Sequence, residues 1–242
     1  MPSDAPDHLP IGDRYQRSTR YYRSQGAVRA PGPAEPAEGT VELPQPQTEG
    51  GEGLWSAIAQ RRSCRKFLDS PLTGDQLAQL LWATQGVTAR RRGFAFRAAP
   101  SAGACYPIDT YLIVHRVERL DPGLYFYNVN DAVLEARRHG DLGPAIAAAC
   151  LGQGMCERAA VVFAWVGVPA RAKRRYHERA YRYLYMDAGH IGQNLHLAAT
   201  ALGLGCCAIG AFFDMEVNAV LGVDGDDEFA AYLSVIGVPD YQ

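Results

Sequence analysis

An unbroken apolar run, AAVVFAWVGV at residues 159–168, most constrains what this chain can fold into. A segment with no polar face for solvent is typical of a strand buried inside a sheet. Two further strands are expected at TYLIVHRV (110–117) and GLYFYNV (123–129), paired across a turn that contains Asp121-Pro122. CCAIGAF (206–212) and AAYLSVIGV (230–238) indicate two more strands near the end of the chain.

Segments with helical periodicity alternate with these strands. The longest expected helix is Tyr183–Leu202, which glycines at 203 and 205 end and in which apolar residues recur along one stripe: Ile191, Leu195, Ala198 and Leu202. Thr73-Gly74-Asp75-Gln76 resembles a capping box and predicts a helix that Gly86 ends. Shorter helices are expected at 54–62 and 141–150. Because at least one strand pair is a hairpin, an α+β layered domain fits better than a doubly wound parallel sheet.

Residues 1–53 differ in composition from the rest of the chain. Asp13–Ser24 is rich in Tyr and Arg and predicts a short helix. From Ala30 to Gly53, five prolines stand among Gly, Glu and Gln, a composition that fits an extended strap and a disordered tail equally well. We therefore expect an N-terminal extension over 1–53 and one compact domain over 54–242.

Charge and cysteine usage exclude several classes of protein. The 242 residues carry a formal net charge of −2, whereas a nucleic-acid-binding domain normally has a basic surplus. The six cysteines form no CxxC pair and no histidine stands at zinc-finger spacing, so no metal site is expected. The first residues contain no secretion signal and no apolar run is long enough to span a membrane. A cytoplasmic protein that binds neither nucleic acid nor membrane is expected.

Four segments concentrate residues that could bind a ligand. Their sequences are RRSCR (61–65), PSAGACYP (100–107), GLGCCAIGAF (203–212) and KRRYHERAYRY (173–183). Arginine forks match phosphate oxygens, and small residues let a flat ligand approach the backbone. Each segment taken alone also fits an ordinary explanation, namely a solvated helix end, a connecting loop or a charged helix with its tyrosines packed inward.

The order and identity of these segments resemble the SagB-type dehydrogenases, the azoline oxidoreductase group of the FMN-dependent nitroreductase superfamily. The resemblance covers roughly Leu54–Pro239 and is carried by RRSCRKF, PLTGDQLAQLLWATQG, PSAGACYPIDTYLIV, GLYFYN, RYHERAYRYLYMDAGHIGQNLHLAATALGLGCCAIGAF and YLSVIGVP. It implies a nitroreductase-like α+β fold with a central, mostly antiparallel sheet flanked by helices. It also implies a homodimer with FMN held at the subunit interface.

The resemblance assigns roles to particular residues of this chain. It places the FMN phosphate, the ribityl chain and the edge of the flavin ring against Arg61, Arg62, Ser63 and Arg65. It packs the flavin against residues of the other subunit, namely Pro100, Ser101, Ala102 and Gly103. It lines the pyrimidine side of the ring with Ile209, Gly210 and Ala211.

The catalytic residues that the resemblance indicates are Tyr176 and Arg175. The family carries a Lys-Tyr pair where this chain has Arg175-Tyr176, and arginine is a poor general base because its pKa is too high. The function implied is hydride transfer between FMN and an organic substrate, with azolines in a peptide natural product as one option and other biosynthetic enzymes as partners. Two alternatives stay open: an NAD(P)H-dependent nitro or quinone reductase, and a catalytically inactive flavin-binding subunit of a biosynthetic complex.

Overall fold

The computed structural model describes residues 8–23 and 35–241. The helices are α1 (Ile11–Ser18), α2 (Leu54–Gln60), α3 (Gly74–Gln85), α4 (Gly143–Ala149), α5 (Met155–Arg158), α6 (Pro169–Tyr176), α7 (Ala180–Ala201) and α8 (Asp214–Leu221), with 3-10 turns at Ala102–Ala104 and His177–Arg179. The strands are β1 (Glu35–Pro36), β2 (Thr40–Glu42), β3 (Val87–Arg91), β4 (Phe94–Arg97), β5 (Ile108–Val114), β6 (Gly123–Asn128), β7 (Val133–His139), β8 (Val161–Gly167), β9 (Gly205–Ile209) and β10 (Phe229–Gly237).

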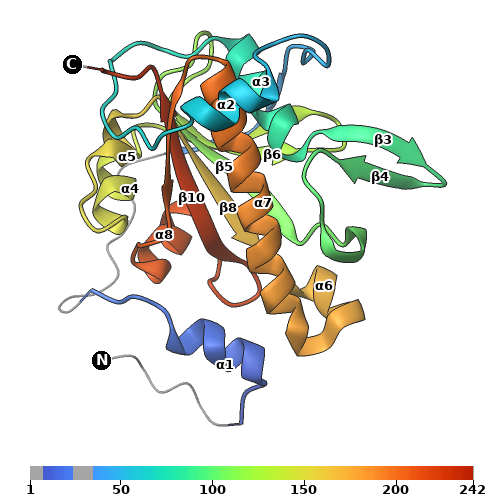
Figure 1. Ribbon diagram of the computed structural model, residues 1–242. Coiled ribbons are helices and arrows are strands. Elements are labelled where there is room, and N and C mark those ends of the chain that lie inside the picture. Colours follow the sequence, from blue (N-terminus) through green and yellow to red (C-terminus); the bar gives the residue numbers. More distant parts are fainter. Residues whose placement is uncertain (1–7, 24–34, 242) are drawn as a thin grey trace.

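An antiparallel sheet forms the centre of the molecule (Figure 1). Its strand order is β1-β7-β6-β5-β8-β10-β9, and β2 also pairs with β7. The apolar run lies in the middle of the sheet, where Val161 of β8 stands opposite Val114 of β5 and Ile236 of β10. Every residue of β8 is buried, which confirms the predicted buried strand. The α+β class with a mostly antiparallel sheet is confirmed as well.

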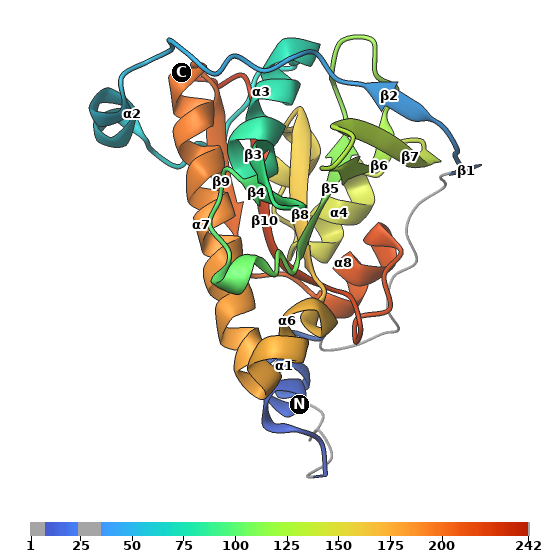
Figure 2. The ribbon, with the colours of Figure 1, turned by 90° about the vertical axis from the view of Figure 1, so that its right-hand side faces the viewer.

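Helices cover both faces of the sheet and create two hydrophobic cores. On one face α3 and α7 pack on β5 and β8, so that Leu80, Leu195 and Trp165 share one core. On the other face α4 and α8 cover the sheet, and Ile146, Val217 and Val235 belong to the second core. Figure 2 shows α7 running along the whole height of the sheet. A strand covered on both faces must be apolar on both sides, which explains the composition of β8.

The expected helices are present, with shifted ends. The Thr73 capping box is confirmed, because the Thr73 hydroxyl accepts from Gln76 N–H and the Gln76 side chain accepts from Thr73 N–H. The helix expected over 54–62 ends at Gln60, and its three large apolar residues are exposed: Leu54 (57%), Trp55 (81%) and Ile58 (46%). Helical spacing identified α2 correctly, but this chain alone does not bury its apolar face.

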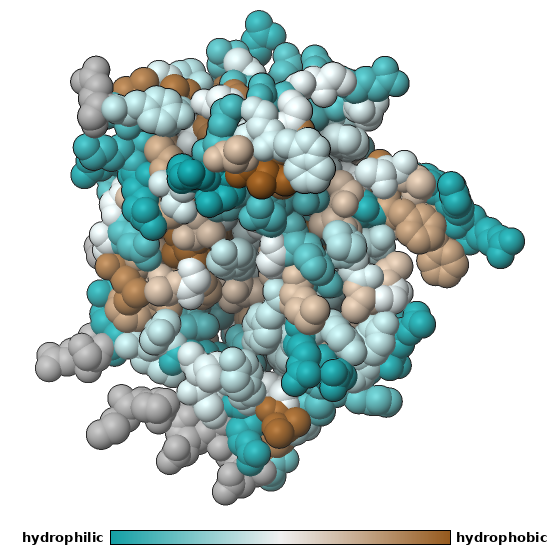
Figure 3. Space-filling model, in the orientation of Figure 1, coloured by the Kyte–Doolittle hydropathy of each residue, from teal (hydrophilic) through white to brown (hydrophobic). Residues whose placement is uncertain are grey.

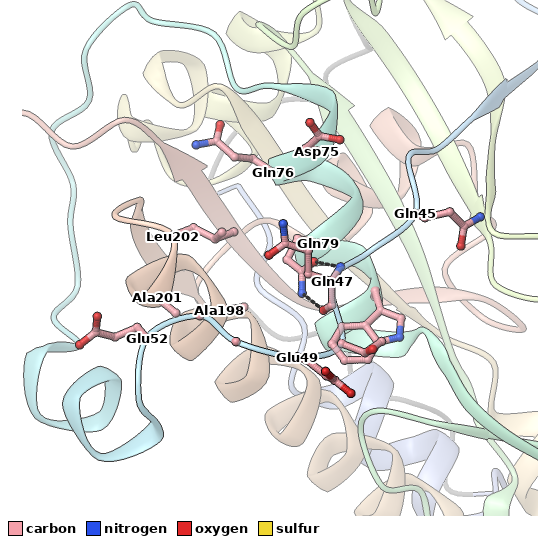
Figure 4. Close-up of a pocket in the computed structure, with 14 residues that line it drawn as sticks. Gln45, Gln47, Glu49, Glu52, Asp75, Gln76, Gln79, Ala198, Ala201 and Leu202 are labelled. Atoms are coloured by element: carbon pink, nitrogen blue, oxygen red, sulfur yellow. Dashed lines mark hydrogen bonds between the residues drawn. The ribbon is translucent and has the colours of Figure 1, made fainter.

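The proline-rich segment of the extension lies along the sheet and over α3. β2 adds to β7, with Val41 opposite Leu134. Further on, Gln47 N–H donates to the Gln79 side chain of α3 (2.7 Å), and the Gln79 amide donates back to the Gln47 carbonyl (2.9 Å). Figure 4 shows this pair beside a cavity of about 350 Å³ between the strap, α3 and α7. Residues 24–34 lie outside the described part of the chain.

Across residues 8–23 and 35–241, no helix combines the length and the apolar character needed to cross a bilayer. The same residues contain no cluster of three His, Cys, Asp or Glu side chains that could hold a metal ion.

Stability should fall in mild acid because the half-buried His115 and the buried His196 resist protonation. Burial lowers the pKa of His115, whose Nε2–H donates to the Cys156 carbonyl (2.9 Å), and burial also lowers the pKa of His196. The unfolded chain, with histidine near 6.5, then binds more protons than the folded chain below that pH. We expect the free energy of unfolding to decrease between pH 7.5 and 5.5, by at most about 1.4 kcal/mol per pH unit for each histidine.

Urea denaturation of His115→Gln, which keeps a donor but does not titrate, should show a smaller decrease than the wild type. His190→Gln, at an exposed position of α7, is the control. An equal pH dependence in the wild type and His115→Gln would contradict the assignment.

Candidate functional site

The segment 61–65 lies along the free side of β9. Ser63 forms a parallel bridge with Cys206, and Cys64 N–H donates to the Cys206 carbonyl (2.8 Å). Gly205 permits this close packing, because a Cβ added there would lie 2.8 Å from Cys64 Sγ. The structure therefore joins two segments that the sequence singled out separately.

A cavity of about 520 Å³ opens beside this contact. Its walls come from the segment after α2, the end of α7, the start of β9 and the chain terminus: Gln60, Arg62, Ser63, Cys64, Arg65, Lys66, Thr200, Gly203, Leu204, Gly205, Asp240 and Tyr241. In the described part of the chain, Arg62 donates to two carbonyls, those of Ala59 (3.1 Å) and Arg61 (2.7 Å). Within the described chain no carboxylate forms an ion pair with Arg62 or Arg65. Guanidiniums without a carboxylate partner at a cavity suit an anionic ligand.

The arginines of segment 61–65 influence the pKa of the neighbouring thiols of β9. Burial raises the pKa of the Cys207 thiol, while the positive charge of Arg65 and a hydrogen bond from Ser63 oppose that shift. The charge of Arg61 acts instead on His196 of α7 and on Cys206, where it acts to lower the pKa of both groups. Arg61 does not line the cavity, so it is placed differently from Arg62 and Arg65.

At the end of β9, Ile209 faces the core, whereas the next two residues are exposed to solvent. Ile209 is buried in the core on the α4 and α8 face, opposite Leu233 of β10. Gly210 and Ala211 are exposed, and the Ala211 carbonyl accepts from the Gln153 amide (3.0 Å). Small exposed residues there leave room for a planar ligand, whereas the Ile209 side chain serves the core.

The loop Pro100–Pro107 has an unusual backbone. Gly103, Ala104 and Tyr106 have φ angles of 58°, 52° and 46°, a left-handed region that side chains other than glycine rarely adopt. Such conformations persist only where the surroundings hold them and are frequent at functional sites.

Asp187 of α7 holds this loop. Its carboxylate accepts from the Ser101 hydroxyl (2.6 Å) and from Ala102 N–H (3.4 Å), and the Ser101 oxygen in turn accepts from Tyr106 N–H (2.9 Å). Asp187 is only 4% exposed. Burial raises the pKa of its carboxyl, and the two loop hydrogen bonds together with the charge of His190 oppose that shift.

Sequence reasoning did not identify Asp187 as a site residue. A signal was present, because Asp187 shares the buried side of α7 with Leu184 and Ile191, at spacings of three and four. A carboxylate on an apolar stripe needs a polar partner, and the loop supplies it.

A second support comes from the base of the β3–β4 hairpin. The Arg97 guanidinium lies over the Tyr106 ring (4.6 Å) and donates to the Gln85 side chain (2.7 Å). The Gln85 amide donates to the Ile108 carbonyl (3.1 Å) and to the Thr110 hydroxyl (2.9 Å). The loop is thus fixed from the α7 side and from the α3 side.

Arg175 and Tyr176, at the end of α6, reach the loop. A Cβ added to Gly103 would lie 2.5 Å from the Tyr176 hydroxyl and 3.0 Å from Arg175 Nη1, so both polar groups stand against the loop backbone. Lys173 is engaged elsewhere, since its ammonium contacts Asp13 (2.7 Å) and Glu178 (3.7 Å). Lys173 is therefore already paired with two carboxylates, away from Gly103.

Within one chain the predicted site residues form two groups. Segment 61–65 meets β9 near Thr200, whereas the loop and the Arg175-Tyr176 pair meet α7 near Asp187. Asp187 and Thr200 are thirteen residues apart in α7, which corresponds to a distance of roughly 20 Å along the helix axis. One chain thus does not bring the loop to the arginine segment, and the ligand-binding roles of these residues stay predictions.

Comparison with known proteins gives a consistent result. The nitroreductase family profile matches residues 58–238. The Methanocaldococcus jannaschii protein MJ1384, named as a nitroreductase, is 35% identical over 76% of this chain and 91% of its own length. The trifolitoxin operon protein TfxC of Rhizobium leguminosarum bv. trifolii is 28% identical over 76% of this chain, which spans 55% of TfxC.

A solved structure agrees with the sequence relatives. A crystal structure from Anabaena variabilis, named as a nitroreductase, superposes with a TM-score of 0.74 at 29% identity, covering 99% of this chain and 50% of that one. The fold and these similarities define an oxidoreductase with a nitroreductase-like architecture. The chain belongs to the nitroreductase family.

Proposed function

We propose that this protein is an FMN-dependent oxidoreductase that transfers a hydride between the flavin and an organic substrate. The observation that carries the proposal is the cavity of about 520 Å³ where Arg62, Ser63 and Arg65 stand beside β9 with no carboxylate paired to the two guanidiniums. A singly phosphorylated flavin has the charge that such a site requires.

The residues present fit FMN in chemistry and in size. Arg62 and Arg65 would bind the phosphate, Ser63 would add a neutral hydrogen bond to the ribityl chain, and Arg61 would reach the ring edge. Gly210 and Ala211 are exposed and small, as the pyrimidine side of a flat ring needs. FMN, when bound, supplies the two-electron chemistry, and the protein supplies orientation and exclusion of water.

A homodimer would complete the site. The loop Pro100–Gly103 lies far along α7 from the arginine segment of its own chain, so a second copy would have to supply it. The surface fits this arrangement, because Trp55 of α2 is 81% exposed and Met186 of α7 is 53% exposed. Figure 3 shows apolar side chains on the face that carries α2 and α7. Sedimentation equilibrium should give twice the chain mass, and a monomer with bound FMN would contradict the shared site.

Two classes of substrate are considered for this protein. A relative from a trifolitoxin operon favours a role in peptide natural product biosynthesis, such as azoline oxidation beside other biosynthetic enzymes. The similarity to a protein named as a nitroreductase favours reduction of nitro compounds or quinones with NAD(P)H. Arg175 weakens the first option, because a guanidinium does not accept the substrate proton. Tyr176, which lies against Gly103 of the loop, would then orient a substrate or donate a proton where the loop of one copy meets the flavin of the other.

One set of measurements tests these proposals. We expect the purified protein to be yellow and to release FMN, identified by mass, on denaturation. Rapid flavin reduction by NADPH in stopped flow favours the reductase; oxidation of an azoline peptide favours the tailoring enzyme. Bound flavin without turnover by either route leaves the non-catalytic subunit, and a protein that neither contains nor takes up FMN would overturn the proposal.

A further inference from the structure

A separate cavity of about 540 Å³ lies between α1 and the start of α7. It is lined by Ile11, Gly12, Tyr15, Glu178, Arg179, Tyr181, Arg182 and Tyr185. None of these residues belongs to the flavin site proposed above. Figures 1 and 2 both show α1 near the start of α7, and Ile11, Gly12 and Tyr15 of α1 form one wall of the cavity.

The wall formed by α1 is held in place by specific contacts. Gly12 packs so closely that an added Cβ would lie 2.3 Å from the Tyr181 ring, and Gly12 N–H donates to the Glu178 carboxylate (2.9 Å). Asp13 binds Lys173 of α6 (2.7 Å) and accepts from the Tyr181 hydroxyl. These contacts tie a segment remote in sequence to the α6–α7 corner, so the cavity is a built feature of the fold.

The interior of the cavity is aromatic. Tyr15 and Tyr185 meet edge to face with ring centroids 6.4 Å apart, and Tyr181 stacks on Phe229 of β10 at 6.1 Å. Ile11 is 67% exposed and Tyr15 is 57% exposed, although both belong to a helix that packs on the domain. Rings and an aliphatic side chain around an open volume suit an apolar or aromatic group.

The charge around the cavity is positive and is not neutralised. Glu178 is its one carboxylate among the lining residues, and that carboxylate is already engaged by Gly12 N–H and Lys173. Arg182 is exposed and forms no ion pair or hydrogen bond with residues 8–23 or 35–241. Among the residues that the structure describes, Arg179 has the Tyr183 hydroxyl (3.0 Å) and ring as its partners. Two guanidiniums without a carboxylate therefore stand at an aromatic pocket.

From this combination we infer that the cavity binds a carboxylate that carries an aromatic group, either as a free acid or as part of a peptide. The Tyr15 and Tyr185 rings together with Ile11 receive the aromatic group, while the buried Tyr181 ring supports them from below. The guanidiniums of Arg179 and Arg182 bind the carboxylate. The inference goes beyond the proposed redox function and does not depend on it.

Ligand-observed NMR titration of the full chain tests the site. The probes are N-acetylphenylalanine, its neutral amide, N-acetylalanine, and a peptide, acetyl-Ala-Glu-Phe-Ala-amide, in which the carboxylate is on the neighbouring side chain. N-acetylphenylalanine should bind at least tenfold more tightly than the amide and than N-acetylalanine. If N-acetylphenylalanine binds more tightly than the peptide, the ligand is a free acid; if the peptide binds more tightly, the ligand is part of a peptide.

Variants locate the binding. Arg182→Gln should weaken binding of the acid about tenfold and leave binding of the amide unchanged, and Gly12→Val should abolish acid binding by displacing α1. Arg91→Gln, on the exposed surface of β3, is the matched control and should have no effect. Equal affinity for acid and amide, or an unchanged affinity in Arg182→Gln, would overturn the inference. FMN content, measured on the same samples, reports separately on the proposed function.

Discussion

Replacement of Arg65 by glutamine is expected to weaken FMN binding by about 10- to 100-fold. Arg65 lines the cavity beside β9 and has no carboxylate partner in the described chain, so the phosphate would be its main ionic contact. A hydrogen bond to a charged group contributes about 1.5–3 kcal/mol, which corresponds to this range of affinity. Arg62→Gln should have a similar effect, because within residues 8–23 and 35–241 Arg62 otherwise donates to backbone carbonyls alone.

Fluorescence quenching of FMN on titration with apoprotein measures these affinities. Arg91→Gln removes the same charge from an exposed position of β3 and should bind FMN as the wild type does. The FMN affinity of Arg65→Gln should also depend less on salt concentration than that of the wild type, since one ionic contact is lost. Wild-type affinity in both cavity variants would place the phosphate elsewhere.

Replacement of Asp187 by asparagine is expected to release the loop 100–107. The carboxylate accepts two hydrogen bonds from the loop, at Ser101 and Ala102, and the amide of asparagine can accept with only one of its two terminal atoms. Loss of one charge-assisted hydrogen bond should cost about 1.5–3 kcal/mol, which for a protein of this size lowers the Tm by about 3–10 °C. The left-handed residues 103, 104 and 106 should then relax.

Limited proteolysis distinguishes release of the loop from general destabilisation. Asn194→Ala removes another side-chain hydrogen bond of α7, the one from Asn194 to the Ala83 carbonyl (2.9 Å), and serves as the matched control. Cleavage within 100–107 should increase in Asp187→Asn and not in Asn194→Ala. If the loop contributes to the flavin site of a second copy, FMN affinity should fall in Asp187→Asn alone. Equal cleavage rates in the two variants would reduce Asp187 to a general packing role.

Much of the fold could be predicted from local sequence pattern. The apolar run of β8, the capping box of α3 and the stripe of α7 each depend on neighbours in the chain, and all three elements are present where expected. β7 and the β3–β4 hairpin were not expected, because VLEARRH and VTARRRGFAFR contain several arginines and lack a clear alternation. These strands form because β6 offers β7 an edge and because β3 and β4 pair with one another.

The candidate site, like the fold, was only partly predictable from the sequence. The sequence by itself determined the residue types, namely guanidiniums at 61–65 and small residues at 101–104 and 210–211, and their order identified the family. Only the tertiary structure decided that Ser63 lies against Cys206, that Asp187 holds Ser101, and that Lys173 pairs with Asp13. Helix and strand patterns report contacts between near neighbours, whereas these contacts join residues 86 to 160 positions apart and depend on how the helices pack on the sheet.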